Sequence, residues 1–129
     1  MFSNKFEEII KATNPQDYIK IFGESYAEQI FIDQINIRKS SIDLDFFAPL
    51  KEMNIPEKWK RKGYDHFRFR IYLIKTSNVS MENLPADGPV NFMIRDQELK
   101  ILSNSHCRIE FSYQKIFLSN IEGYKEGNE

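Results

Sequence analysis

The stretch HFRFRIYLI, residues 66–74, alternates large apolar side chains with polar ones over nine residues. Its apolar members share one parity: Phe67, Phe69, Ile71 and Leu73. Successive side chains of a β-strand point to opposite faces of the sheet, so this alternation predicts a half-buried strand with an inward aromatic row. Arg68 and Arg70 then stand on the opposite, solvent-facing side.

The same period of two recurs through most of the chain. Further strands are predicted at residues 30–37, 42–48, 90–94, 99–102, 107–113 and 115–121. A change of parity near Asp33 and Gln34 predicts a β-bulge, and the short polar join from Arg38 to Ser41 predicts a hairpin. The connections are too short for crossover helices. We therefore expect an α+β fold with one or two short N-terminal helices packed on a mostly antiparallel β-sheet or sandwich of about six or seven strands.

Helix signals are confined to the first two dozen residues. Asn4, three residues before an acidic side chain, predicts the cap of a first helix. Asn14 followed by Pro15 predicts the cap and first position of a second helix, and Gly23 predicts its left-handed end. Residues 50–65, with their cluster of lysine and arginine, read as an irregular connection.

Length and charge limit the classes of protein that the chain can represent. Its 129 residues predict a single globular domain over residues 1–129, with a frayed tail at residues 125–129. Eighteen basic against nineteen acidic residues argue against a dedicated nucleic-acid binder, which is usually basic overall. One cysteine excludes an intrachain disulfide, and neither a signal peptide nor a long apolar run is visible, so we expect a cytoplasmic protein.

Basic residues nevertheless concentrate in residues 51–75, where aromatic side chains are interleaved with them. A platform that stacks nucleic-acid bases needs aromatic and basic groups on the same face. Strand alternation puts Arg68 and Arg70 opposite Phe67 and Phe69, which favours an ordinary strand. The arginines are expected to meet Asp43 and Asp45 on a neighbouring strand.

Candidate catalytic and metal-binding groups are few. His106 and Cys107 are neighbours on a predicted strand, so their side chains diverge and cannot form a dyad. His66 follows an aspartate, but no nucleophile motif accompanies it. Asp43 and Asp45 share a strand face and could hold a divalent cation with a third oxygen ligand. The same spacing is equally well explained as the polar half of an alternating strand. We expect no enzyme activity, no cofactor and no metal.

Four stretches carry a family resemblance: IFGESYAEQIFIDQINIR (21–38), DLDFFAP (43–49), PEKW (56–59) and FRFRIYLI (67–74). Together they resemble the immunity protein fifty group of bacterial polymorphic toxin systems, over roughly residues 19–124. The resemblance implies a cytoplasmic protein that neutralises a cognate toxin by occlusion, without catalytic residues.

Two surfaces are candidates for contact with such a partner. The first is cationic and aromatic: Trp59, Tyr64, Arg68 and Arg70. The second is acidic: Glu24, Glu28, Asp33, Asp43 and Asp45. Trp59 is interpreted either as a plug at one end of the core or as an exposed anchor. Two other functions stay open. One is a small β-rich ligand-binding or structural domain, with a pocket between helices and sheet in the ligand-binding case, and the other is a nucleic-acid-associated module that uses residues 58–75.

Overall fold

The computed structural model describes residues 4–103 and 106–127. In this part of the chain the helices are α1 (Phe6–Ala12), α2 (Gln16–Phe22) and α3 (Glu57–Lys62). The strands are β1 (Phe31–Ile37), β2 (Ser41–Pro49), β3 (His66–Ile74), β4 (Ser77–Glu82), β5 (Val90–Arg95), β6 (Glu98–Ser103), β7 (Arg108–Ser112) and β8 (Lys115–Tyr124). This confirms the predicted α+β class, with one or two helices and one or two strands more than expected. No helix among these residues is long and apolar enough to cross a membrane.

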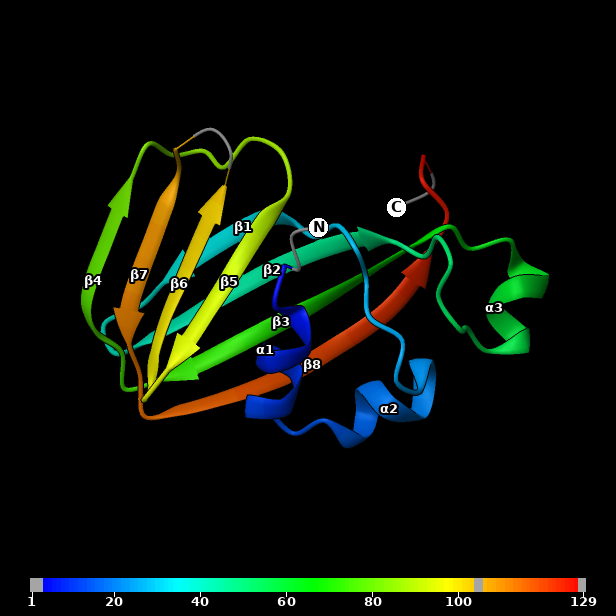
Figure 1. The fold of residues 1–129 in the computed structure, drawn as a ribbon, viewed down its shortest axis with the longest axis horizontal. Coiled ribbons are helices and arrows are strands. Elements are labelled where there is room, and N and C mark those ends of the chain that lie inside the picture. The colour runs from blue at the N-terminus through cyan, green and yellow to red at the C-terminus, as the bar shows by residue number, and fades with distance from the viewer. Residues whose placement is uncertain (1–3, 104–105, 128–129) are drawn as a thin grey trace.

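The strands form two antiparallel sheets of four (Figure 1). Sheet A has the order β1-β2-β3-β8, and sheet B has the order β4-β7-β6-β5. β3 pairs with β8 in sheet A, and their chain neighbours β4 and β7 pair in sheet B. The backbone N–H of Gln114, between β7 and β8, donates to the carbonyl of Ile74 at 2.9 Å. One two-stranded ribbon therefore runs through both sheets and turns at this point.

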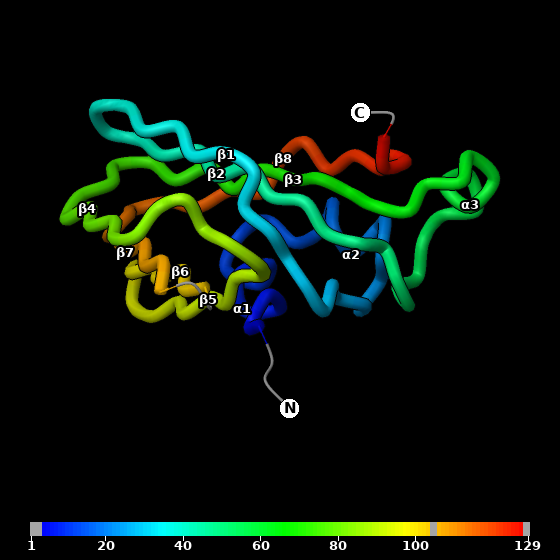
Figure 2. Tube along the Cα trace, turned by 90° about the horizontal axis from the view of Figure 1, so that it is seen from above, coloured from blue at the N-terminus to red at the C-terminus, as the bar shows by residue number. Residues whose placement is uncertain are grey.

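Sheet B, α1 and α2 all lie on the same side of sheet A. Seen edge-on in Figure 2, sheet B, α1 and α2 lie beneath sheet A. The predicted inward row of β3 is buried, with Phe67, Phe69, Ile71 and Leu73 at most 2% exposed. The ring of Phe6 on α1 lies 5.1 Å from Phe69 in sheet A and 6.2 Å from Phe92 in sheet B. The core thus joins both sheets through the first helix.

The predicted hairpin and bulge are both present in β1 and β2. The N–H of Arg38 donates to the carbonyl of Ser41 at 2.9 Å, which closes the hairpin. The register of β1 on β2 shifts between Ile32 and Gln34, where the sequence changes parity. Ile32 and Ile35 can therefore both face the core although they are three residues apart.

The helix starts differ from their predictions. α1 begins at Phe6, and its cap position is Lys5 rather than the predicted Asn4. The Asn4 side-chain oxygen still accepts from the Phe6 N–H, while its amide donates to the carbonyl of Ala27 at 3.0 Å. Asn14 is not the cap of α2 either. Its side-chain oxygen accepts from the Leu118 N–H at 2.9 Å, so it extends the edge of sheet A. Long-range partners compete with local capping for these amide side chains.

Two elements were missed from the sequence. Residues 50–65 are not wholly irregular, because they contain α3, which begins after Pro56 and ends at Gly63 with φ 70°. α3 has six residues and none of them is fully buried, so no apolar period marks it. β4 has no inward row either, and it forms as the continuation of the β3 ribbon.

Candidate functional site on the outer face of sheet A

The outer face of sheet A is the side turned away from α1, α2 and sheet B (Figure 2). It presents alternate residues of the two central strands: Asp43, Asp45 and Phe47 from β2, and Arg68, Arg70 and Tyr72 from β3. In the register, Asp45 lies opposite Arg70, and Phe47 lies opposite Arg68. Of the predicted contacts between the β3 arginines and the β2 carboxylates, the structure therefore contains the one between Arg70 and Asp45.

A groove of about 760 Å³ hollows this face. Its acidic and basic side chains are four carboxylates, two guanidinium groups and one imidazole: Asp33, Asp45, Glu122, Glu126, Arg68, Arg70 and His66. Phe47 and Tyr124 add aromatic surface. The groove has an excess of acidic over basic groups.

Two β-bulges flank the groove and give it a shape that a flat sheet would lack. One is the bulge of β1, next to Asp33 and Gln34. The other is in β8, where Ser119 pairs with Arg70 but Glu122 pairs with Arg68, so that β8 has one residue more than β3 over this stretch. Asn120 in this second bulge has φ 54°, a left-handed conformation that asparagine tolerates. Bulges bend a strand and increase its twist, which accounts for a hollow between them.

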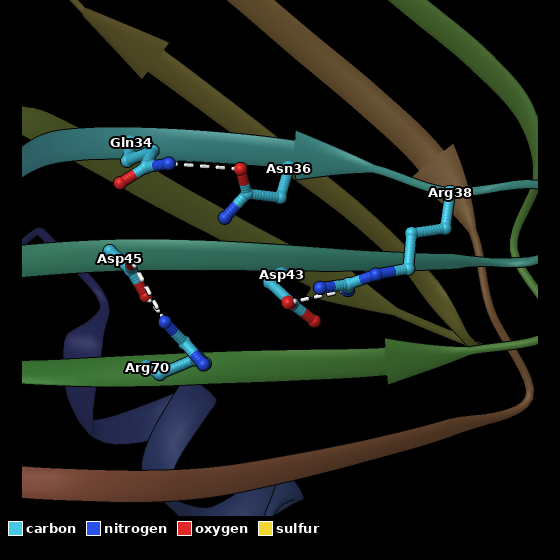
Figure 3. A network of polar contacts seen from close by, with 6 residues as sticks. All are labelled: Gln34, Asn36, Arg38, Asp43, Asp45 and Arg70. Atoms are coloured by element: carbon cyan, nitrogen blue, oxygen red, sulfur yellow. Dashed lines mark hydrogen bonds and ion pairs between the residues drawn. The ribbon is translucent and has the colours of Figure 1, made fainter.

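Both arginines of the groove are held by carboxylates. Arg70 donates from Nε to Asp45 Oδ1 at 2.7 Å and from Nη2 to Asp45 Oδ2 at 3.3 Å (Figure 3). The hydrogen bond and charge of Asp45 raise the pKa of Arg70 above its ordinary value. Arg68 Nε lies 3.4 Å from Glu122 Oε2, and its guanidinium lies 5.0 Å from the ring centre of Tyr124. These cations are neutralised locally and fixed in direction.

Asp43 lies further along β2 and is buried, with 3% of its surface exposed. Arg38, at the end of the hairpin, reaches across to it and donates to Oδ2 (Figure 3). Oδ1 is buried and accepts no hydrogen bond among the described residues. Asp43 and Asp45 thus belong to different ion pairs, and only Asp45 lines the groove.

The structure separates the remaining candidate residues from this groove. Glu24 and Glu28 are exposed in the segment between α2 and β1, and the backbone of Glu28 accepts from the Asn4 amide at 3.1 Å. Trp59 and Tyr64 pack against each other at 5.9 Å between ring centres, and Trp59 also meets the buried Phe22 at 5.6 Å. These contacts favour the interpretation of Trp59 as a plug at the end of the core. Contact of these four residues with a partner stays a prediction.

Several groove residues were not anticipated as site residues from the sequence, and three of them come from β8: Asn120, Glu122 and Tyr124. They lie in and beyond the β8 bulge, where the outward residues change from odd to even positions. No apolar alternation marks that change, because the strand end carries few large side chains.

Cys107 and His106, the neighbouring pair considered as a catalytic dyad, lie apart from the groove. Cys107 is 2% exposed, and burial raises the pKa of its thiol, so the reactive thiolate is disfavoured. Its neighbour His106 is exposed.

At the end of the groove, His66 Nδ1 lies 2.8 Å from Asp65 Oδ1. This hydrogen bond, followed by one from the Glu126 N–H, lowers the pKa of Asp65.

Comparison of the chain with protein-family models, with curated proteins and with solved structures finds no match.

Proposed function

We propose that this chain is a non-catalytic protein-binding domain, and that it is an immunity protein which neutralises a cognate bacterial toxin by occlusion. The observation that carries the binding role is the outer face of sheet A, which the described helices and sheet B leave uncovered and which two bulges hollow into a groove. The immunity role rests on the sequence resemblance to the immunity protein fifty group.

The lining of the groove supports a partner with a basic surface. Its four carboxylates exceed its two guanidinium groups, and both arginines already have a carboxylate partner. Asp33 is exposed on β1 and is available to lysine or arginine from outside. Complementary charge raises the association rate and discriminates between partners. Basic surfaces are typical of proteins that act on nucleic acids, so a nuclease toxin fits this groove.

The aromatic groups of the groove support a protein partner. Phe47 stacks on Phe31 with ring centres 5.2 Å apart, and Tyr124 stacks on His66 at 5.5 Å. Interfaces are enriched in aromatic residues and arginine, and side chains held by their neighbours lose little entropy on binding.

The two alternative functions receive less support. The space between the helices and sheet A, where an apolar ligand would bind, is occupied by packed rings such as Phe6, Phe22 and Phe69. For nucleic acid, the expected contacts of Arg68 and Arg70 with phosphates would compete with their existing ion pairs.

The test is capture of partners by the tagged chain from the cytoplasm of its source cell, with washes at low and at high salt. The proposal predicts one protein, encoded beside the gene of this chain, that survives the high-salt wash and whose toxicity in a host is suppressed by co-expression of this chain. Recovery of nucleic acid alone, lost at high salt, would overturn it.

A further inference from the structure

His66 sits at the junction of three segments near the end of the groove. It is the first residue of β3, it follows Asp65, and it faces the turn after β8 that carries Glu126. One ligand atom from each of the three residues can be chosen so that all lie within 4.8 Å of one another. Among the described residues this is the cluster of histidine and carboxylates with spacing suited to a metal ion.

The imidazole is fixed in orientation before any ligand arrives. Its ring stacks on Tyr124 with the planes 27° apart, and its side chain is 15% exposed. Asp65 Oδ1 also accepts from the Glu126 N–H, and a carboxylate oxygen is a hydrogen-bond acceptor, so the 2.8 Å contact places a proton on Nδ1. In the neutral ring this leaves the lone pair on Nε2, the nitrogen that faces Glu126.

Asp65 is itself held in place by the turn after β8. The backbone N–H of Glu126 donates to Asp65 Oδ1 at 2.8 Å, and the N–H of Asp65 donates to the carbonyl of Tyr124 at 3.1 Å. A carboxylate that orients a histidine through its other ring nitrogen is a recurrent feature of metal sites, where it fixes the tautomer and increases the basicity of the ligand.

The two candidate ligand atoms are separated by nearly the distance that binding one metal ion requires. Glu126 Oε2 lies 3.8 Å from His66 Nε2. Zinc binds imidazole nitrogen and carboxylate oxygen at about 2.0–2.2 Å, so two such ligands in tetrahedral geometry stand about 3.4 Å apart. The Glu126 side chain is 71% exposed and can close the difference by rotating.

We propose that His66 Nε2 and the Glu126 carboxylate bind a divalent transition-metal ion, zinc in the first place, with Asp65 as the positioning residue of the imidazole. Imidazole with carboxylate suits zinc, copper or nickel rather than magnesium or calcium. Water completes the coordination in the isolated chain, and the open positions face the groove that His66 and Glu126 line. The site is independent of the proposed partner and can be tested without one.

The experiment is titration of the untagged chain with Zn²⁺ by calorimetry, accompanied by ¹H–¹⁵N spectra of the histidine rings. We expect one Zn²⁺ per chain and a shift of the His66 Nε2 resonance. His66→Ala should abolish binding, and Glu126→Gln should weaken it at least tenfold without disturbing the fold, because Glu126 is exposed. His106→Ala removes the other imidazole, which is exposed and belongs to a different segment, and should bind as the wild type does.

The positioning role of Asp65 has its own readout. Asp65→Asn should weaken Zn²⁺ binding by about 10–100-fold. It should also change the tautomer of His66 in the metal-free spectrum, which a merely structural role would leave unchanged. Failure of the wild type to bind Zn²⁺, or equal loss in His66→Ala and His106→Ala, would overturn the proposal.

Discussion

Gly123 in β8 lies directly beneath two aromatic rings, and Gly123→Ala tests how tightly α3 is packed on sheet A. A Cβ atom added to Gly123 would stand 2.5 Å from Tyr64 Cδ2 and 2.9 Å from Trp59 Cδ2 and Cε3. Carbon atoms in contact are about 3.5–4.0 Å apart, so Tyr64 would have to move by about 1 Å and Trp59 by about 0.6 Å. Trp59 is backed by the buried ring of Phe22, which limits that movement.

The expected cost follows from two opposing effects. Gly123 has no positive φ, so alanine would by itself stabilise the chain by about 0.4–1 kcal/mol through the unfolded state. Overpacking costs about 1–3 kcal/mol, and the clash with two rings places this substitution at the upper end. We expect a net loss of about 2 kcal/mol in the free energy of unfolding.

The assay is urea unfolding followed both by circular dichroism and by the fluorescence of Trp59, the single tryptophan of the chain. Lys115→Ala, at the exposed start of β8, is the control and should change stability by less than about 0.5 kcal/mol. In a Tyr64→Ala background the cost of Gly123→Ala should fall by about 1 kcal/mol, because the nearest ring is gone. An unchanged cost in that background, or none in the wild type, would refute the packing of α3 on β8.

Three further predictions concern single side chains. Trp59→Ala should lower the free energy of unfolding by about 2–3 kcal/mol in a urea titration, because it empties a partly buried site against Phe22. A loss below about 0.5 kcal/mol would favour an exposed anchor instead. Arg38→Ala leaves the buried carboxylate of Asp43 unpaired and should cost about 1–3 kcal/mol, and this loss should shrink when Asp43→Ala is added. Cys107 should react with a thiol reagent at pH 8 only as fast as the chain unfolds, and rapid reaction of the folded protein would show that its thiol is accessible.

The alternation of β3 was enough to predict the central strand, because burial of one face leaves a direct mark on the sequence. The bulge of β1 was also predictable, since its isoleucines change parity at Asp33. Elements without a buried row were not predictable in this way. β4 has only Val79 and Met81 as apolar residues, neither of them buried, and its pairing follows from the ribbon that it shares with β3.

The groove was predictable only in part. Arg68, Arg70, Asp33 and Asp45 were candidates from the sequence, and the structure brings them to one face. Glu122 joins them through the β8 bulge, which no local pattern announces. That a residue is acidic did not indicate on which face of the protein it lies. Glu24 resembles these carboxylates in the sequence but lies in the segment between α2 and β1.

The binding role of the groove is tested most directly by one comparison of affinities. A captured partner would be purified and titrated by calorimetry with the wild type, with Asp33→Lys in the groove, and with Glu24→Lys outside it. A groove that binds a basic surface predicts at least a tenfold loss of affinity for Asp33→Lys and no change for Glu24→Lys, since like charges oppose each other only at the interface. Equal affinity of Asp33→Lys and the wild type, with loss in Glu24→Lys, would place the partner on another surface.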